Sequence, residues 1–332
     1  MNKVMNRPEN FVDESLSGIV LAHGRALKFA DGNTRSVVRA DAPVSGKVAI
    51  VTGGGYGHLP VFLGYVGKGF CDGVAVGNVF TSPSCEAIAD AARAVNGGAG
   101  VLFLFGNYMG DTMNFEMAAE LLGMDDIPIA IVKAADDIAS APRETYRERR
   151  GVGGIFFPYK LVGAKAERMA PLDEVRETAE SVCENVATLG FSMSSCQLPG
   201  MLKPIFEISQ TEMELGMGIH GEPGVERTTM KTSAELAEIL TEKLCADLKI
   251  KEGDEVAVLV NSLGATSKEE LYILYHDLYA RLNQRGLRVY KAFVGEYATS
   301  LEMLGASVSI LKLNEEFKRL LSDSAETPFI KV

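Results

Sequence analysis

The chain has 332 residues, of which 47% are hydrophobic and 23% are charged, and its formal net charge is −11. These values are ordinary for a soluble globular protein, and the length suits two domains. The acidic balance argues against non-specific binding to nucleic acid or to an anionic membrane surface, and no apolar run is long enough to span a bilayer.

The five cysteines are scattered and form no Cys-x-x-Cys pair. This pattern argues against a disulfide framework or a zinc ribbon and is typical of a reducing compartment. The first ten residues lack the apolar core of a secretory signal. We therefore expect a cytoplasmic protein.

Residues 1–46 are mostly polar, and we expect them to pack as a lead-in on the first domain. From residue 48 onward, short apolar runs alternate with helical segments, which indicates an α/β fold with a wound, largely parallel sheet and helices on both faces. The predicted strands are 48–51, 73–79, 100–105 and 127–132. The predicted helices are 86–95, 112–122, 151–169 and 172–189, with a further helix expected to begin near Pro60.

The charged stretch 143–150 is interpreted as a solvated helix or loop face. Near residue 190 the pattern changes to short strand-like pieces, so we divide the chain into a first α/β domain, 1–190, and a second α/β domain, 191–332. The second domain is predicted to contain strands at 191–194, 204–208, 214–217, 255–261, 288–293 and 307–313 and helices at 235–248 and 268–282.

A glycine-rich turn follows the first predicted strand and ends at His58. Glycine is needed where a backbone takes positive φ or approaches a ligand closely, and ligands of open α/β sheets bind beyond the carboxyl ends of the strands. His58 is therefore a candidate site residue. The alternative is a tight strand-to-helix turn whose histidine is merely exposed.

Two further loops carry candidate groups. Asp111 follows another predicted strand, although it could equally be the N-cap of the next helix. His220 has glycine close on both sides and is followed by Glu-Pro-Gly, a context that favours a functional role. His23 and His276 are interpreted as structural. On the assumption of a parallel sheet, His58, Thr81, Ser82 and Asp111 should converge on one edge.

Several motifs of nucleotide, metal and hydrolase sites are missing. The glycine stretches match neither a Walker A loop nor a dinucleotide fingerprint, and there is no Gly-x-Ser-x-Gly elbow and no His-x-x-x-His pair. We therefore expect no nucleotide or metal site on this chain. The two candidate histidines and the aspartate fit a different kind of site better. In it, one histidine acts as a nucleophile or hydrogen-bonding group, and the second histidine and the carboxylate transfer protons.

Taken together, five motifs in order resemble the substrate-binding K subunit of dihydroxyacetone kinases. They are Gly-Gly-Gly-x-Gly-His, Gly-Tyr-Val-Gly-Lys-Gly, Val-Phe-Thr-Ser-Pro, Asn-Tyr-x-Gly-Asp-x-Met-Asn-Phe and Gly-Ile-His-Gly-Glu-Pro-Gly. The resemblance extends from about residue 15 to the end. It implies two α/β domains, a homodimer and a kinase that phosphorylates a short ketose.

In that family, the histidine that matches His220 adds to the carbonyl carbon of the sugar and forms a hemiaminal. The residues that match His58 and Asp111 act as acid and base groups, so the resemblance implies three catalytic residues. The implied substrate-binding positions are Gly55, Tyr56, Gly57, His58, Gly106 and Asp111, and no metal is implied on this chain.

The resemblance also implies that the phosphoryl donor is carried elsewhere. A separate L subunit holds ADP, which a phosphotransferase phosphocarrier relay rephosphorylates, or holds ATP, with Mg²⁺ at that nucleotide. This agrees with the missing nucleotide motif. In phosphoryl transfer the positioning of the reactants does most of the work, and a covalently held substrate is strongly positioned.

The sequence departs from the best-known members at three positions. Tyr56 stands where they have serine, Leu59 where they have glutamate, and Gly106 where they have a substrate-contacting lysine. The Gly-Asn-Tyr-x-Gly-Asp variant resembles the branch that contains ketotetrose kinases, so a preference for erythrulose is one alternative. A non-catalytic ketose-binding coactivator of a transcription regulator is another, and a self-sufficient ATP-dependent kinase is a weaker third.

Overall fold

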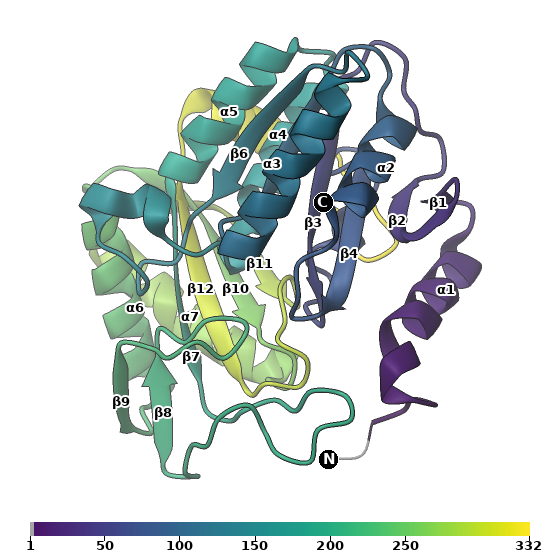
Figure 1. Cartoon of the computed structure of the whole chain (residues 1–332). Coiled ribbons are helices and arrows are strands. Elements are labelled where there is room, and N and C mark those ends of the chain that lie inside the picture. Colours follow the sequence, from purple (N-terminus) through teal and green to yellow (C-terminus); the bar gives the residue numbers. More distant parts are fainter. Residues whose placement is uncertain (1–2) are drawn as a thin grey trace. The chain divides into compact units, whose positions relative to one another are not determined.

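The computed structural model describes residues 3–332, which form two compact units, each built on a six-stranded sheet (Figure 1). The first unit takes in the chain up to Ala134 together with Pro158–Ser181 and Arg319–Val332, and the second takes in Ala135–Phe157 and Val182–Lys318. The units therefore interleave along the chain, whereas the sequence suggested one boundary at 190. That boundary falls inside strand β7 (Val186–Ser192) of the second unit.

The sheet of the first unit has the strand order β1-β2-β4-β3-β5-β6. Its parallel part consists of the four predicted strands, now bounded as β3 (Ala49–Tyr56), β4 (Gly73–Val79), β5 (Val101–Gly106) and β6 (Ile129–Ala134). The predicted lead-in contains two strands that the sequence analysis missed. These strands, β1 (Leu27–Ala30) and β2 (Asn33–Arg39), form an antiparallel hairpin that joins the sheet beside β4. Their connection, Asp31-Gly32, is a common hairpin turn sequence, and Gly32 has φ 81°.

Helices cover both faces of this sheet, as predicted. Helices α2 (Cys85–Val95) and α3 (Met109–Gly123) lie over one face (Figure 1), where their apolar side chains pack with those of β3 and β5. On the other face, the hydroxyl of Tyr159 in α4 (Phe156–Glu167) lies 2.5 Å from Thr52 Oγ1 in β3.

The helix expected to begin near Pro60 is absent, and that prediction was wrong. Between β3 and β4 the chain forms turns and one short 3₁₀ helix, η2 (Leu63–Tyr65). The covering helix comes instead from α4, later in the chain. Gly163 of α4 approaches the loop closely, since a Cβ atom there would lie 2.4 Å from the carbonyl oxygen of Gly69.

The sheet of the second unit has the order β11-β10-β12-β7-β8-β9, and only β10 and β11 are parallel. Besides β7, its strands are β8 (Glu212–Leu215), β9 (Glu226–Thr229), β10 (Glu255–Ser262), β11 (Arg288–Gly295) and β12 (Gly305–Lys312). The predicted strand at 204–208 is not formed, and β9 was not predicted.

Helices α6 (Ser233–Asp247) and α7 (Lys268–Gln284) each begin with a capping box and pack leucines into one apolar core. The remaining α-helices are α1 (Phe11–His23), α5 (Leu172–Glu184) and α8 (Glu315–Ser322).

The stretch 143–150 is not wholly solvated, which corrects the prediction. It forms a 3₁₀ segment, η3 (Arg143–Glu148), but the side chain of the following Arg149 is only 1% exposed. Its guanidinium forms two hydrogen bonds to the carboxylate of Asp247, of 2.5 and 3.0 Å, and a third to the carbonyl of Ala141. A buried cation needs such partners, and the partner lies about a hundred residues away in sequence.

Candidate functional site

Three loops meet at the carboxyl edge of the parallel strands in the first unit, as predicted. The ring of His58, which follows β3, stacks on Phe80, which follows β4, with 4.7 Å between ring centroids and an interplanar angle of 12°. A Cβ atom on Gly110 of α3 would lie 2.6 Å from Ser82 Oγ. Asn114 Nδ2 of the same helix donates to the carbonyl of Pro83 at 2.7 Å. These contacts hold the start of α3 beside the loop that contacts His58.

The glycine run is shaped by close packing inside the protein. A Cβ atom on Gly54 would meet the ring of Phe62 at 2.0 Å, and one on Gly55 would lie 2.6 Å from the backbone nitrogen of Thr81. Gly57 has φ 105°, which favours glycine. The cavity beside this turn is about 10 Å³, about the smallest space that can hold one water molecule. Strand β3 continues through these glycines to Tyr56, which lies five residues beyond the predicted end of the strand.

His58 is fully buried, so the alternative of an exposed histidine on a strand-to-helix turn is wrong. Besides stacking on Phe80, its ring packs edge-on to Phe62, with 6.4 Å between ring centroids. An imidazole held between two aromatic rings has a fixed orientation. This is a suitable setting for a group that must transfer a proton in one direction.

Asp111 lies in the first turn of α3 and is 5% exposed. The N-cap of that helix is Tyr108, so the interpretation of Asp111 as the N-cap was wrong. The positive end of the helix dipole favours a carboxylate at this position. Gly106 ends β5 in register with Ala134 of β6, and the next residue's backbone nitrogen donates to Ala134 at 2.9 Å. Gly106 thus holds the strand end that leads to the Asp111 turn.

Tyr56 is directed toward helix α1. Its hydroxyl lies 2.5 Å from Ser15 Oγ, and its ring packs edge-on to Phe11 at 6.2 Å. Burial raises the pKa of the Tyr56 phenol, although the hydrogen bond with Ser15 opposes this effect. Tyr56 and Leu59, two of the positions that differ from the best-known family members, lie on either side of Gly57 and His58. Leu59 is half-buried.

His220 belongs to the second unit and lies in a tight turn between β8 and β9. The nitrogen of Gly218 donates to the carbonyl of Glu222 at 3.1 Å, and the nitrogen of Gly221 donates to the carbonyl of Gly218 at 3.1 Å. Ser300 Oγ donates to the carbonyl of Ile219 at 2.5 Å. Gly221 has φ 81°, so at least one of the flanking glycines is required by the backbone conformation.

Glu222 contacts His220 at two points. Its Oε1 lies 3.0 Å from Nδ1 of the ring, and its Oε2 accepts the backbone N–H of His220 at 2.9 Å. Burial by itself would raise the pKa of Glu222, but the hydrogen bond and charge interaction with His220 lower the pKa of this carboxyl to about 2. A carboxylate that accepts a hydrogen bond from Nδ1–H keeps the proton of the neutral ring on Nδ1 and the lone pair on Nε2, which can then act as a nucleophile.

Gly218 leaves the space that this carboxylate occupies. A Cβ atom on Gly218 would lie 2.1 Å from Glu222 Oε2 and 2.7 Å from Nη1 of Arg150. Arg150 in turn pairs with Asp137 at 2.6 Å and donates to the carbonyl of Gly216 at 3.2 Å. Gly218, two residues before His220, is therefore needed to leave room for the Glu222 carboxylate.

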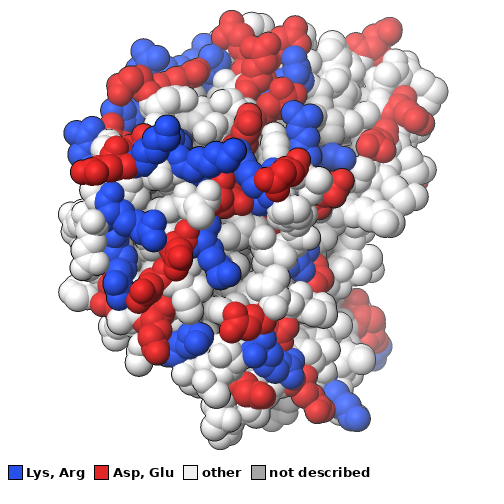
Figure 2. Space-filling model, turned by 90° about the vertical axis from the view of Figure 1, so that its left-hand side faces the viewer, with Lys and Arg blue, Asp and Glu red and all other residues white. Residues whose placement is uncertain are grey.

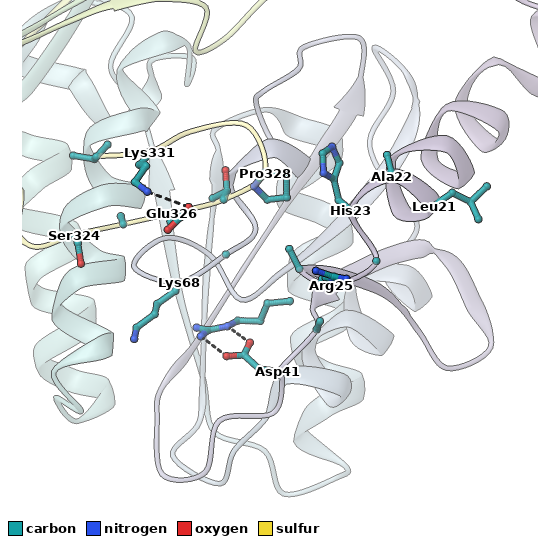
Figure 3. Close-up of a pocket in the computed structure, with 18 residues that line it drawn as sticks. Leu21, Ala22, His23, Arg25, Asp41, Lys68, Ser324, Glu326, Pro328 and Lys331 are labelled. Carbon is teal, nitrogen blue, oxygen red and sulfur yellow. Dashed lines mark hydrogen bonds and ion pairs between the residues drawn. The ribbon is translucent and has the colours of Figure 1, made fainter.

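A cavity of about 960 Å³ in the first unit does not contain any of the predicted site residues (Figure 3). It is lined by the end of α1, by residues 39–41 at the end of β2 and by residues near the C-terminus, and Arg39 in this lining pairs with Asp41 and with Asp72. Lys331 and Glu326 form another ion pair at its border, 3.4 Å apart. Its volume alone therefore does not identify the site.

On the face shown in Figure 2, acidic and basic side chains of the described residues are interspersed, without an extended basic surface. Within residues 3–332 there is no group of three or more His, Cys, Asp or Glu placed to hold a metal ion. None of the helices in this range is both long and apolar enough to cross a membrane.

Four positioning residues were not predicted from the sequence: Phe80, Asn114, Glu222 and Ser300. Glu222 could have been found, because an acidic residue two positions after a histidine in a glycine turn can fold back onto the ring. Asn114 stands in a quoted motif, but its bond to Pro83 depends on how α3 packs. Phe80 and Ser300 act through contacts that no local sequence pattern predicts.

The chain matches known proteins over its whole length. The Dak1 domain profile matches residues 17–329. The chain is 40% identical to the dihydroxyacetone-binding subunit DhaK of the PTS-dependent dihydroxyacetone kinase 2 of Listeria innocua, with full coverage of both chains. It is 41% identical to a D-erythrulose kinase of Mycolicibacterium smegmatis, with 100% of this chain and 57% of that protein covered.

Solved structures give the same result. The native dihydroxyacetone kinase of C. freundii aligns with a TM-score of 0.90 at 31% identity, covering 98% of this chain and 59% of that one. A dihydroxyacetone kinase operon co-activator, Dha-DhaQ, aligns with a TM-score of 0.87 at 30% identity, covering 94% and 96% of the two chains. The sequence motifs, the two α/β units and these matches together show that the chain belongs to the Dak1 domain family, among dihydroxyacetone kinase substrate-binding subunits and related erythrulose kinases.

Proposed function

We propose that this chain is the sugar-binding subunit of a dihydroxyacetone-type kinase and that it holds a short ketose covalently on His220. The observation that carries the proposal is the pair of contacts between Glu222 and His220, which directs the Nδ1 proton to a carboxylate and leaves Nε2 as the nucleophile. Substrates without a carbonyl, such as glycerol, would not be trapped.

The trapping step is an addition. The Nε2 lone pair attacks the carbonyl carbon, a C–N bond forms, and the carbonyl electrons move to the oxygen, which takes a proton from an acid group. The ring then carries a positive charge, which the Glu222 carboxylate balances while it still accepts the hydrogen bond from Nδ1, and the acid group is left as its conjugate base. We assign the acid and base roles to His58 and Asp111, which the first unit holds at one sheet edge, with Gly55, Tyr56, Gly57 and Gly106 shaping that edge.

The phosphoryl donor, in this proposal, is a separate nucleotide-carrying L subunit with ADP or ATP and Mg²⁺, served where needed by a phosphotransferase phosphocarrier. Two observations support this. The chain has no phosphate loop motif, and the 40% identical relative from Listeria innocua is the dihydroxyacetone-binding subunit of a PTS-dependent kinase. We further propose a cytoplasmic homodimer, which light scattering would test.

The test is a soak with dihydroxyacetone and, separately, with erythrulose, followed by crystallography and intact mass measurement of wild type and His220→Ala. A sugar-sized adduct that depends on His220 is expected. Phosphorylation is then assayed with donor subunits of the family. An adduct that is missing by both methods would overturn the covalent mechanism.

A second candidate is a ketose-binding coactivator, because the Dha-DhaQ co-activator aligns over 94% of this chain. It would form the adduct but would not turn it over with any donor subunit. The erythrulose alternative is separated by comparing kcat/KM for the two ketoses. Equal efficiency on dihydroxyacetone and on longer ketoses would count against it.

A further inference from the structure

Helix α3 and the residue that follows it, Met124, carry a stripe of exposed methionines, Met109, Met113, Met117 and Met124. They are 82%, 58%, 50% and 76% exposed. At about 100° per residue these four positions lie within about 80° of one another around the helix axis, so they form one face. The opposite face of α3 is buried through Phe115, Ala118 and Leu122. We call the four residues the methionine stripe.

Isolated exposed apolar side chains are common, but Met109, Met113 and Met117 follow one another at intervals of four residues and form an apolar strip about 12 Å long at 1.5 Å per residue, with Met124 farther along the same side. Methionine is flexible and polarizable, and it is frequent on surfaces that bind other proteins. The first unit leaves this strip uncovered. Two exposed acidic residues share this side of the helix: Glu116 lies beside Met113 and Met117, and Glu120 lies between Met117 and Met124.

The methionine stripe begins at the candidate site. Met109 is the first residue of α3, two positions before Asp111, and the next residue, Gly110, is the one that packs against Ser82. A protein that delivers a phosphoryl group must bring the donor within bonding distance of the sugar hydroxyl. It must therefore cover the sheet edge at which α3 starts, and the adjacent surface is the stripe.

We propose that the methionine stripe is the docking surface for the phosphoryl-donor protein. The partner has an apolar patch bordered by Lys or Arg side chains, which complement Glu116 and Glu120. This inference rests on the proposed function, because it takes a separate donor protein as given. It adds the place of contact and the chemistry of the partner's surface.

The test uses Met113→Lys/Met117→Lys, which lies beyond the first helical turn and so leaves Asp111 in place. Leu21→Lys on α1 is the matched control, because Leu21 is 83% exposed on another helix of the same unit. The probe is the family donor subunit that supports phosphorylation by wild type. We expect the double variant to raise the KM for that subunit at least tenfold, with an unchanged His220 adduct and melting temperature. The control should behave like wild type.

A second arm places a photocrosslinking benzoylphenylalanine at Met113 or at Leu21. Crosslinking to the donor subunit from 113 but not from 21 is expected, and Glu116→Lys/Glu120→Lys should weaken the association. An unchanged KM together with no crosslink from 113 would overturn the inference, as would a crosslink to a second copy of this chain. Failure of the proposed function is recognised separately, because wild type itself would then phosphorylate no ketose.

Discussion

Glu222 binds both the ring and the backbone of His220, with Oε1 3.0 Å from Nδ1 and Oε2 2.9 Å from the backbone nitrogen. Both contacts join residues only two positions apart, so the ring is oriented locally, while Ser300 holds the same turn by donating to the carbonyl of Ile219. The space that Gly218 leaves is what allows the carboxylate to reach both groups. A histidine fixed in this way has one tautomer and one reactive nitrogen.

The first prediction concerns that relationship. Glu222→Gln removes the negative charge and places an NH₂ group against one of two donors, so the Nδ1–H tautomer loses its preference. We expect the ketose adduct to form about 10–100-fold more slowly, as is typical when a group that orients a functional histidine is lost. The pH optimum for adduct formation should also shift. The measurement is the rate of adduct formation against pH, with Glu226→Gln, an exposed neighbour on β9, as the control.

The second prediction is a pH dependence of stability. The folded-state pKa of Glu222, about 2, lies below the ordinary value of 4.5. A depressed carboxyl pKa contributes stability above the unfolded-state value, and that contribution is lost as the pH falls from about 4.5 toward 2. We expect wild type to exceed Glu222→Gln by about 1–2 kcal/mol in free energy of unfolding at pH 6, after allowing for the partial exposure of the carboxyl.

The difference should shrink at pH 3. Denaturant titrations at both pH values measure it. A gap of the same size at pH 6 and pH 3 would show that the loss comes from packing and not from ionisation.

The third prediction concerns His58. His58→Asn keeps a polar group between Phe80 and Phe62 but removes the titratable ring. We expect kcat for ketose phosphorylation to fall about 10²–10⁴-fold, the usual contribution of a general acid or base. His276→Asn, on a histidine whose side chain is 84% exposed, should leave kcat unchanged. Unaltered turnover in His58→Asn would remove His58 from the proposed mechanism.

The sequence predicted the parallel strands of the first unit and the convergence of their loops, because buried strands and glycine turns are local patterns. It also singled out His58, Asp111 and His220 for the site. It could not predict that the two units interleave, since α4 returns to the first unit through contacts such as Gly163 against Gly69. It placed the charged stretch 143–150 in solvent because the partner of Arg149 is Asp247, which no local pattern links to it.

That buried pair gives the fourth prediction. Arg149→Met leaves Asp247, whose side chain is 10% exposed, without its main cationic partner. Breaking a buried ion pair from one side costs about 3–5 kcal/mol, so the free energy of unfolding should fall by about 3 kcal/mol. Arg147→Ala, an exposed position in the same stretch, should change it by less than about 0.5 kcal/mol. A second variant, Arg149→Met/Asp247→Leu, should recover part of the loss, because no charge is then left buried; no recovery would indicate that packing of the arginine stem dominates.

The last prediction concerns Tyr56, the departure from the best-known members that lies closest to the glycine turn. Because its hydroxyl contacts Ser15 of α1, Tyr56→Phe should cost about 1 kcal/mol, the typical contribution of one hydrogen bond. The ratio of kcat/KM for erythrulose to that for dihydroxyacetone should stay the same, since the hydroxyl is directed to α1. Ser15→Ala should lower stability by a similar amount, and the double variant should lose no more than either single change, because both remove the same bond. A changed ketose ratio in Tyr56→Phe alone would show that the phenol contacts the substrate, and the specificity of this chain would then depend directly on residue 56.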